Sequence, residues 1–224
     1  MTLDQVSAEV QAPVAVPSDN RREVMLRAAL QVIAARGFAD TRIADVAERA
    51  GTSPALVIYY FQSKDKLLTE AIRLAEDRWF EQGVRRLRAI PDAVGRLEEI
   101  VTWICVPEPD GEFPDPWSLW IDLWARSQRH PAVARVREEF DARWRSAISG
   151  VITDGQTLGT FGPMDAVEFA IALLALLDGL AVQMALGDPS VDAPFVLRTV
   201  MGFAALVLGF TWTGAFPVTV TAGP

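Results

Sequence analysis

The segment "TRIADVAERAGTSPALVIYYFQSKDKLL", residues 41–68, contains two short helical patterns separated by a turn. Gly51 would end the first helix, Ser53 can cap the start of the second, and Pro54 stands at a first helical position, where a missing N–H costs nothing. This arrangement predicts a helix-turn-helix. The apolar residues of its first half follow the i, i+3, i+4, i+7 spacing of one helix face: Ile43, Val46, Ala47 and Ala50.

Residues 20–36 predict a preceding helix. Apolar side chains recur there every four residues, Gly37 follows as a C-terminal cap, and Thr41 can cap the next helix. The apolar stripe consists of Val24, Met25, Ala28, Ala29, Val32 and Ile33.

The charge of this region differs from that of the rest of the chain. Between Asn20 and Leu68, eight bases and five acids give +3, whereas the first 19 residues carry −3 and the residues after Leu68 carry −8, for a total of −8 over 224 residues. A basic region on an acidic chain is typical of a module that binds a polyanion, although a solvated helix face would show the same pattern.

Residues 20–80 resemble the DNA-binding domain of the TetR family of transcriptional regulators. The matching positions are Gly37, Thr41, Ala47, Gly51, Ser53, Phe61, Lys64 and Leu67. The resemblance implies an all-α fold, in which a three-helix helix-turn-helix domain that binds double-stranded operator DNA is joined to a helical ligand-binding and dimerisation domain. We therefore expect a disordered tail at 1–19, the DNA-binding domain at 20–80, the second domain at 81–215, and a tail at 216–224.

The uncharged stretch of residues 54–62 is predicted to be the recognition helix. Val57 and Phe61 lie one turn apart and should face inward. That leaves an outward face of small and apolar residues, which can read thymine methyl groups in the major groove: Pro54, Ala55, Ile58 and Tyr59.

The resemblance further implies roles for single residues. Phosphate contacts fall on Thr41, Arg42, Tyr60 and Lys64, and base contacts on Pro54, Ala55, Leu56 and Tyr59. The Ser53 hydroxyl and the free N–H groups of its helix are also placed for phosphates. Many family members carry a phosphate-binding tyrosine where this chain has Ile58. Two alternatives stay open: Tyr60 as a half-buried core aromatic, and Ile58 packed on the first helix.

Further helices are predicted at 64–90, 92–106, 117–129 and 132–153, with prolines between them. The first of these, which Pro91 ends, is long enough to act as a lever between the two domains.

Aromatic side chains cluster in the first half of the second domain, and three of them recur at i, i+3 and i+7 on one helix face. They are Trp103, Phe113, Trp117, Trp120, Trp124 and Trp144. Bodies of TetR-like regulators hold a small-molecule site, and aromatic walls are its usual lining, so we expect a ligand pocket here. An ordinary filled aromatic core is the alternative. Acids nearby, such as Asp122, would suit a cationic or polar ligand of unknown identity.

Two C-terminal segments, residues 164–188 and a charge-free stretch from Thr199 onward, are apolar on most faces and are therefore predicted to be buried. The resemblance implies a homodimer interface built from two helices per subunit. The expected interface residues are Ala166, Ala170, Ala175, Gly179 and Leu206. A membrane anchor is the less favoured alternative. The strings "LWIDLWARSQRHPAVA" and "LLALLDGLAVQ" resemble regulators with a BetI-type C-terminal half.

The sequence does not favour an enzyme. Its single histidine, His130, precedes a proline at a helix junction, Cys105 is the only cysteine, and there is no glycine-rich phosphate loop, so we expect no catalytic residues, no metal site and no cofactor. The acidic N-terminus lacks the pattern of a secretory signal, which favours the cytoplasm. The resulting hypothesis is a dimeric, ligand-responsive DNA-binding regulator, most simply a repressor. A constitutive regulator without ligand is the alternative.

Overall fold

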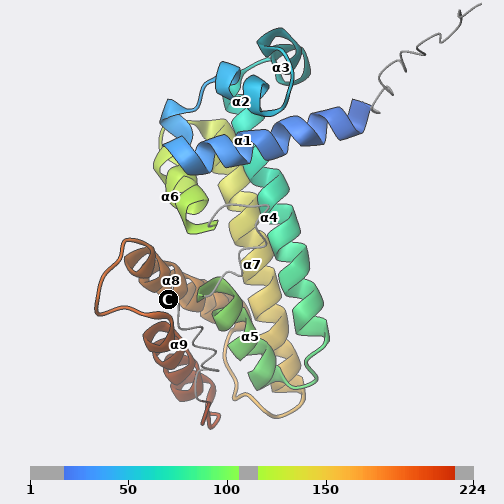
Figure 1. Cartoon of the computed structure of the whole chain (residues 1–224). Coiled ribbons are helices and arrows are strands. Elements are labelled where there is room, and N and C mark those ends of the chain that lie inside the picture. The colour runs from blue at the N-terminus through green and yellow to red at the C-terminus, as the bar shows by residue number, and fades with distance from the viewer. Residues whose placement is uncertain (1–17, 106–115, 215–224) are drawn as a thin grey trace, which may run out of the picture.

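The computed structural model describes residues 18–105 and 116–214, and these form an all-α structure, which confirms the predicted fold class (Figure 1). Helices α1, α2 and α3 form a compact head at one end of the molecule. Their bounds are Ser18–Asp40, Ile43–Arg49 and Pro54–Phe61.

Helix α4 begins under the head and runs to the far end of the molecule beside α7, which is similarly long (Figure 1). Helix α6 lies directly below α1, while α5, α8 and α9 lie farther from the head. We call α5–α9 the body. The bounds are Lys64–Arg88 for α4, Ala93–Cys105 for α5, Pro116–Ser127 for α6, Pro131–Thr157 for α7, Ala166–Ala185 for α8 and Ala193–Leu208 for α9.

Local sequence signals set the helix ends in the head. The Ser53 hydroxyl accepts a hydrogen bond from the Leu56 N–H at 3.2 Å, so Ser53 caps α3 as predicted. Gly37 has a φ of +77°, a left-handed value that suits glycine. It interrupts α1 at the predicted end, but helical turns continue beyond it to Asp40.

Two clusters of buried apolar side chains hold the structure together. The body cluster includes Leu97, Ile148 and Leu177 and joins α4–α9. The head cluster is not confined to the head, because it also takes in Leu123 of α6 and Phe140 of α7. The head therefore shares its core with two body helices, and a displacement of α6 would disturb that core.

Helices α8 and α9 each bury one face and expose another. Ala170 is fully buried in the core of its own subunit, whereas Ile171 is 46% exposed and Leu206 is 84% exposed. Ala175 and Gly179 are exposed and Ala166 is half-buried. Of the expected interface residues, Ala170 is thus placed on the inner face of α8. By length and composition alone, α8 is long and apolar enough to cross a membrane. This is weak evidence for a membrane span, because the core helices of soluble proteins meet the same criteria.

Candidate functional sites

The outer face of α3 carries the side chains expected to meet DNA bases. Tyr59 is 77% exposed and Ile58 is 43% exposed, while Pro54 and Ala55 are also exposed. Val57 on the opposite face is fully buried. Ile58 therefore does not pack on α1, and the outward orientation that the spacing predicts is present.

Two further residues of α3 have a mixed position. Leu56 and Tyr60 are half-buried and pack against the head cluster. The Tyr60 ring lies edge-on to Tyr59, with 5.6 Å between the ring centroids. Tyr60 thus follows the half-buried alternative, and its ring helps to fix the direction of Tyr59.

The residues expected at phosphates differ in how free their side chains are. The Thr41 hydroxyl is buried and donates to the Gly37 carbonyl oxygen at 2.8 Å, so it holds the α1–α2 turn. Lys64 donates from Nζ to the Ala39 carbonyl oxygen at 2.7 Å and ties α4 to the end of α1. Arg42 is exposed, and its guanidinium has no ion pair among residues 18–105 and 116–214. Of these three residues, Arg42 is the one whose side chain is not tied to another described part of the chain.

A small, partly open cavity lies between α4, α5, α6, α7 and α8. Its volume is about 20 Å³, which suffices for roughly one water molecule. Aromatic and acidic side chains dominate its wall, which consists of Trp79, Ile104, Trp117, Trp120, Asp141, Trp144, Leu174 and Asp178. We call it the tryptophan cavity.

Three of the predicted ligand residues, Trp117, Trp120 and Trp144, line this cavity. Trp124 packs behind the first two, with ring centroids 6.3 Å from Trp117 and 5.7 Å from Trp120. Trp103 stands behind the wall as well, because it stacks on Trp79 at 6.1 Å. Phe113 lies outside the described residues. The aromatic cluster is therefore mostly filled, around a small hollow.

The acids of the cavity are unusual because burial favours their neutral forms. Burial raises the pKa of Asp178 to about 7, aided by the charge of Asp141, while Arg145 acts in the opposite direction. Burial also raises the pKa of Asp141, against the influence of Arg137 and Arg145. A positive charge placed in the cavity would favour the ionised forms of both acids and lower their pKa values, since opposite charges stabilise each other.

Glu76 supports the tryptophan wall from behind. Its Oε1 accepts a hydrogen bond from Trp144 Nε1 at 2.9 Å, and Trp120 also hydrogen-bonds to its side chain. Burial raises the pKa of Glu76 to about 8, so its carboxyl is largely protonated at neutral pH. Glu76 thereby holds two of the wall indoles in fixed orientations.

Asp122 does not reach the cavity. Its carboxylate accepts a hydrogen bond from the Phe38 N–H at 2.9 Å, and Arg126 on the same helix pairs with Asp65 at 2.8 Å. The Arg126 guanidinium also lies 3.7 Å above the Phe38 ring centroid. Helix α6 therefore directs its tryptophans toward the cavity, and its polar side chains Asp122 and Arg126 contact Phe38 of the head.

Sequence reasoning missed Trp79, Asp141 and Asp178 as cavity residues. Trp79 has the spacing of an ordinary core residue on α4. Asp178 carried a usable signal, since it is an acid within a long apolar stretch of α8, and such an acid needs a partner or a function. Nothing in the spacing joins it to Asp141, which lies on another helix.

Comparison with known proteins gives two family matches. The model for the C-terminal part of BetI-type transcriptional repressors matches residues 93–209. The model for the N-terminal part of bacterial regulatory proteins of the tetR family matches residues 25–71.

Curated relatives agree with these matches. The chain is 29% identical over 182 residues to the HTH-type transcriptional regulator BetI of Escherichia coli O17:K52:H18, covering 78% of this chain and 87% of that protein. It is also 29% identical over 190 residues to BetI of Burkholderia cenocepacia, covering 84% of this chain and 94% of the relative.

Solved structures show the same fold. A Saccharomonospora viridis transcriptional regulator in complex with choline has a TM-score of 0.74 and 32% identity, over 83% of this chain and 95% of its own. A TetR-family regulator from Rhodococcus sp. has a TM-score of 0.72 and 26% identity, over 85% of this chain and 99% of its own.

Proposed function

The chain belongs to the TetR family of bacterial regulatory proteins, with a BetI-type C-terminal part, and we propose that it is a dimeric repressor that a small organic cation releases from its operator. Membership makes it a DNA-binding transcriptional regulator and not an enzyme. The tryptophan cavity with its buried acids is the observation that carries the proposed response to a cation. The protein would act in the cytoplasm, with residues 20–80 binding DNA and residues 81–215 sensing and dimerising.

The exposed face of α3 supports a role in reading bases, with Arg42 and the N-terminal N–H groups of α3 on the flanking phosphates. An apolar recognition face of this kind selects thymine methyl groups and the shape of the groove. Most of the affinity would come from the phosphate contacts, so it would depend strongly on salt concentration.

The outer faces of α8 and α9 support dimerisation. Val167 and Ile171 on α8, and Phe195 and Leu206 on α9, expose apolar side chains that no other described part of the chain covers. Ala175 and Gly179 lie exposed on α8 and would allow close helix packing. A second copy of the same two helices would bury these faces in a self-complementary contact. The dimer would then present two recognition helices to the two half-sites of a near-palindromic operator.

The cavity favours a cation of modest size. Indole faces attract positive charge, and Asp178 can supply the balancing negative charge, whereas Asp141 is already paired with Arg137. The choline found in the Saccharomonospora viridis regulator has this chemistry. We therefore propose choline, or another small quaternary ammonium compound, as the effector of this chain.

The cavity is too small for such a ligand as it stands, so the wall must move to admit one. Trp117 and Trp120 belong to α6, which also contacts Phe38 of the head through Asp122 and Arg126. Ligand entry would displace α6 and weaken its grip on Phe38. The state with ligand would then hold the two heads at a spacing that no longer fits the operator, which gives the two sites reciprocal coupling.

The test begins by selecting bound fragments from genomic DNA to obtain an operator. Choline is then titrated into the protein–operator complex in an electrophoretic mobility assay, with 3,3-dimethylbutan-1-ol as an uncharged ligand of the same shape. We expect choline alone to release the DNA, and Asp178→Asn to reduce the response at least tenfold. Glu168→Gln, an exposed acid on the same helix, is the matched control. Operator binding that ignores every quaternary ammonium compound would instead favour a constitutive regulator.

A further inference from the structure

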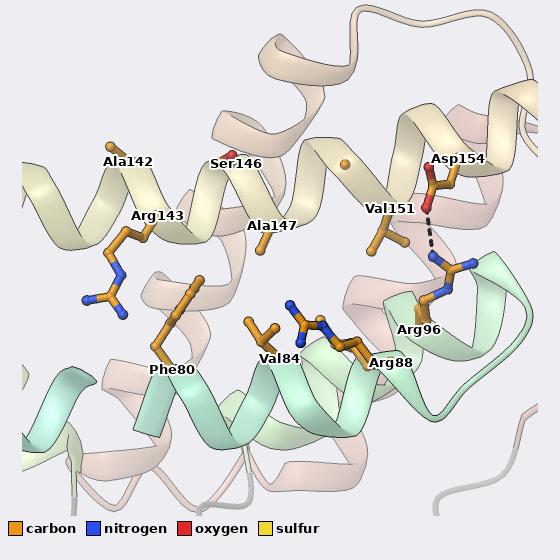
Figure 2. A pocket seen from close by; sticks show the side chains of 12 residues that line it. Phe80, Val84, Arg88, Arg96, Ala142, Arg143, Ser146, Ala147, Val151 and Asp154 are labelled. Atoms are coloured by element: carbon orange, nitrogen blue, oxygen red, sulfur yellow. Dashed lines mark hydrogen bonds and ion pairs between the residues drawn. The ribbon is translucent and has the colours of Figure 1, made fainter. Parts of the chain in front are cut away.

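A second and larger hollow lies between α4 and α7, on a side of these helices that does not face the tryptophan cavity. It is an open groove of about 600 Å³ (Figure 2). Phe80 and Val84 of α4 face Ala147 and Val151 of α7 across it, so its walls are mainly apolar. This volume lies in the range of sites that hold small organic molecules.

The charge of the groove is opposite to that of the chain. Three arginines and one aspartate line it, which gives +2, whereas the whole chain carries −8. Arg96 is already paired with Asp154 at 2.7 Å, and this pair closes the end of the groove near α5 (Figure 2). Arg143 is paired with Asp77 and lies over the Phe80 ring, 4.3 Å from its centroid.

Arg88 is the arginine that remains available. It is exposed, and neither a hydrogen bond nor an ion pair joins it to any of the residues that the structure describes. Figure 2 shows its guanidinium between α4 and α7, near Val84 and on the side of Val151. A free guanidinium beside apolar walls can bind one carboxylate through two parallel hydrogen bonds, while the walls take up a hydrocarbon body.

We propose that this groove is a second ligand site, which binds an amphipathic monocarboxylate with its carboxylate on Arg88 and its hydrocarbon chain along Phe80, Val84 and Val151. One unpaired arginine matches one negative charge, because Arg96 and Arg143 already have acidic partners. The tryptophan cavity and this groove would therefore take ligands of opposite charge. This site does not depend on the proposed effector, because none of its lining residues lines the cavity.

The probe is decanoate, titrated into the full-length protein by isothermal calorimetry below its micelle concentration. We expect one decanoate per chain, with decan-1-ol and decyltrimethylammonium binding at least tenfold more weakly. Arg88→Gln should weaken decanoate binding at least tenfold, whereas Arg85→Gln, which removes an exposed arginine of α4 outside the groove, should change it less than twofold.

A pair of glycine variants tests the place of binding independently of charge. A Cβ at Gly150 would meet no atom within 4 Å, so a side chain there can be added without disturbing the fold. Gly150→Ala should bind decanoate as the wild type does, while Gly150→Phe should reduce binding at least fivefold by filling the groove. Equal binding by these two variants would contradict the assignment.

Other outcomes would overturn the proposal directly. Absence of decanoate binding at 1 mM would exclude the site, and so would binding of decan-1-ol as tight as that of decanoate. Loss of binding in Trp120→Ala with normal binding in Arg88→Gln would move the ligand to the tryptophan cavity. A change of oligomeric state in Arg88→Gln, measured by sedimentation velocity, would instead assign the groove to a contact between chains.

Discussion

The head and the body place their functional side chains in opposite environments. On α3 of the head, Tyr59 is 77% exposed and reaches into solvent, whereas Trp117 and Trp144 of the tryptophan cavity are only 5% and 4% exposed. An exposed side chain such as Tyr59 acts through the contacts that it makes with a binding partner. A buried side chain such as Trp144 also determines the packing of its neighbours and their pKa values. Its replacement therefore changes the structure of the free protein.

The head and the body also differ in the charge of their functional residues. Residues 20–68 carry +3, with Arg42 exposed, while the acids of the cavity have raised pKa values because burial disfavours their ionised forms. The head is therefore prepared for a polyanion at all physiological pH values, because arginine stays protonated. In the proposed function, the body would respond to a cation and to protons through the same carboxyl groups.

The largest effect is expected at α8 and α9, because the head would bind the operator tightly only when these helices join two chains. Leu206 is 84% exposed in the single chain, so Leu206→Lys should leave the subunit folded. In a dimer the lysine would be buried without a partner, at a cost of several kcal/mol per subunit. We expect monomers or aggregates in analytical ultracentrifugation and an operator affinity reduced by at least about 100-fold, since two half-sites must be held one helical turn apart.

Ala89→Lys, which adds the same charge at an exposed position after α4, should remain dimeric and bind normally. A Leu206→Lys monomer with full operator affinity would show that the head is independent of the body, and a wild-type protein found only in membranes would rule out the dimer.

The second prediction concerns the pH dependence of stability, which should come from the buried acids of the body. Asp178 has a pKa of about 7 in the folded chain and about 3.9 when unfolded, so between these values the folded state holds a proton that the unfolded state has lost. Stability therefore falls as the pH rises from 4 through 7 and levels off above 8.

Asp178→Asn removes this dependence. Chemical unfolding at pH 5 and pH 8 should show the variant gaining roughly 2.5 kcal/mol on the wild type at the higher pH, since the folded pKa lies about two units above pH 5 and one unit corresponds to about 1.4 kcal/mol. Glu168→Gln, on the exposed face of α8, should leave the profile unchanged. An identical pH profile in wild type and Asp178→Asn would mean that Asp178 is ionised in the folded protein.

The same division explains what the sequence could predict. Helix periodicity, the Ser53 cap and the glycines placed the helices of the head, and the i, i+4 spacing of Val57 and Phe61 gave the outward face of α3. These are local features of the chain, and they depend on a few neighbouring residues. The long helices α4 and α7 were predictable for the same reason.

The cavity was only partly predictable, because its wall comes from five helices. Tryptophan spacing predicted Trp117 and Trp120 on one face of α6, but it did not distinguish Trp103 behind the wall from Trp79 within it. Asp122 was expected near the ligand because it lies beside these tryptophans in sequence, yet it points to the head on the other side of α6. Which acids meet in a cavity depends on helix packing, and one helix's pattern does not contain that information.

Neighbouring tyrosines of α3 should have different roles. Tyr59→Ala should alter which operator bases are preferred, by about 1 to 3 kcal/mol at the affected positions, because an exposed ring that reads bases contributes only in the complex. Tyr60→Ala, one residue on, should chiefly lower the unfolding temperature, since that ring packs on the head cluster. Selection from randomised operators and thermal unfolding measure the two effects. Unchanged base preference in Tyr59→Ala would exclude its role in reading.

The smallest effect is expected at Arg42, and it separates a general contact from a specific one. Arg42→Ala removes an exposed guanidinium that has no ion pair in the described parts of the chain, so its loss should leave stability nearly unchanged. Each phosphate contact releases counterions, and removal of one should lower the slope of log affinity against log salt by about 0.9. The loss should be equal for operator and random DNA, because phosphates carry no sequence information. Arg85→Ala, which removes an exposed arginine near the C-terminal end of α4, should leave the slope unchanged. If Arg42→Ala instead changed the base preference and left the salt slope constant, Arg42 would contact bases. Base recognition would then not be confined to α3.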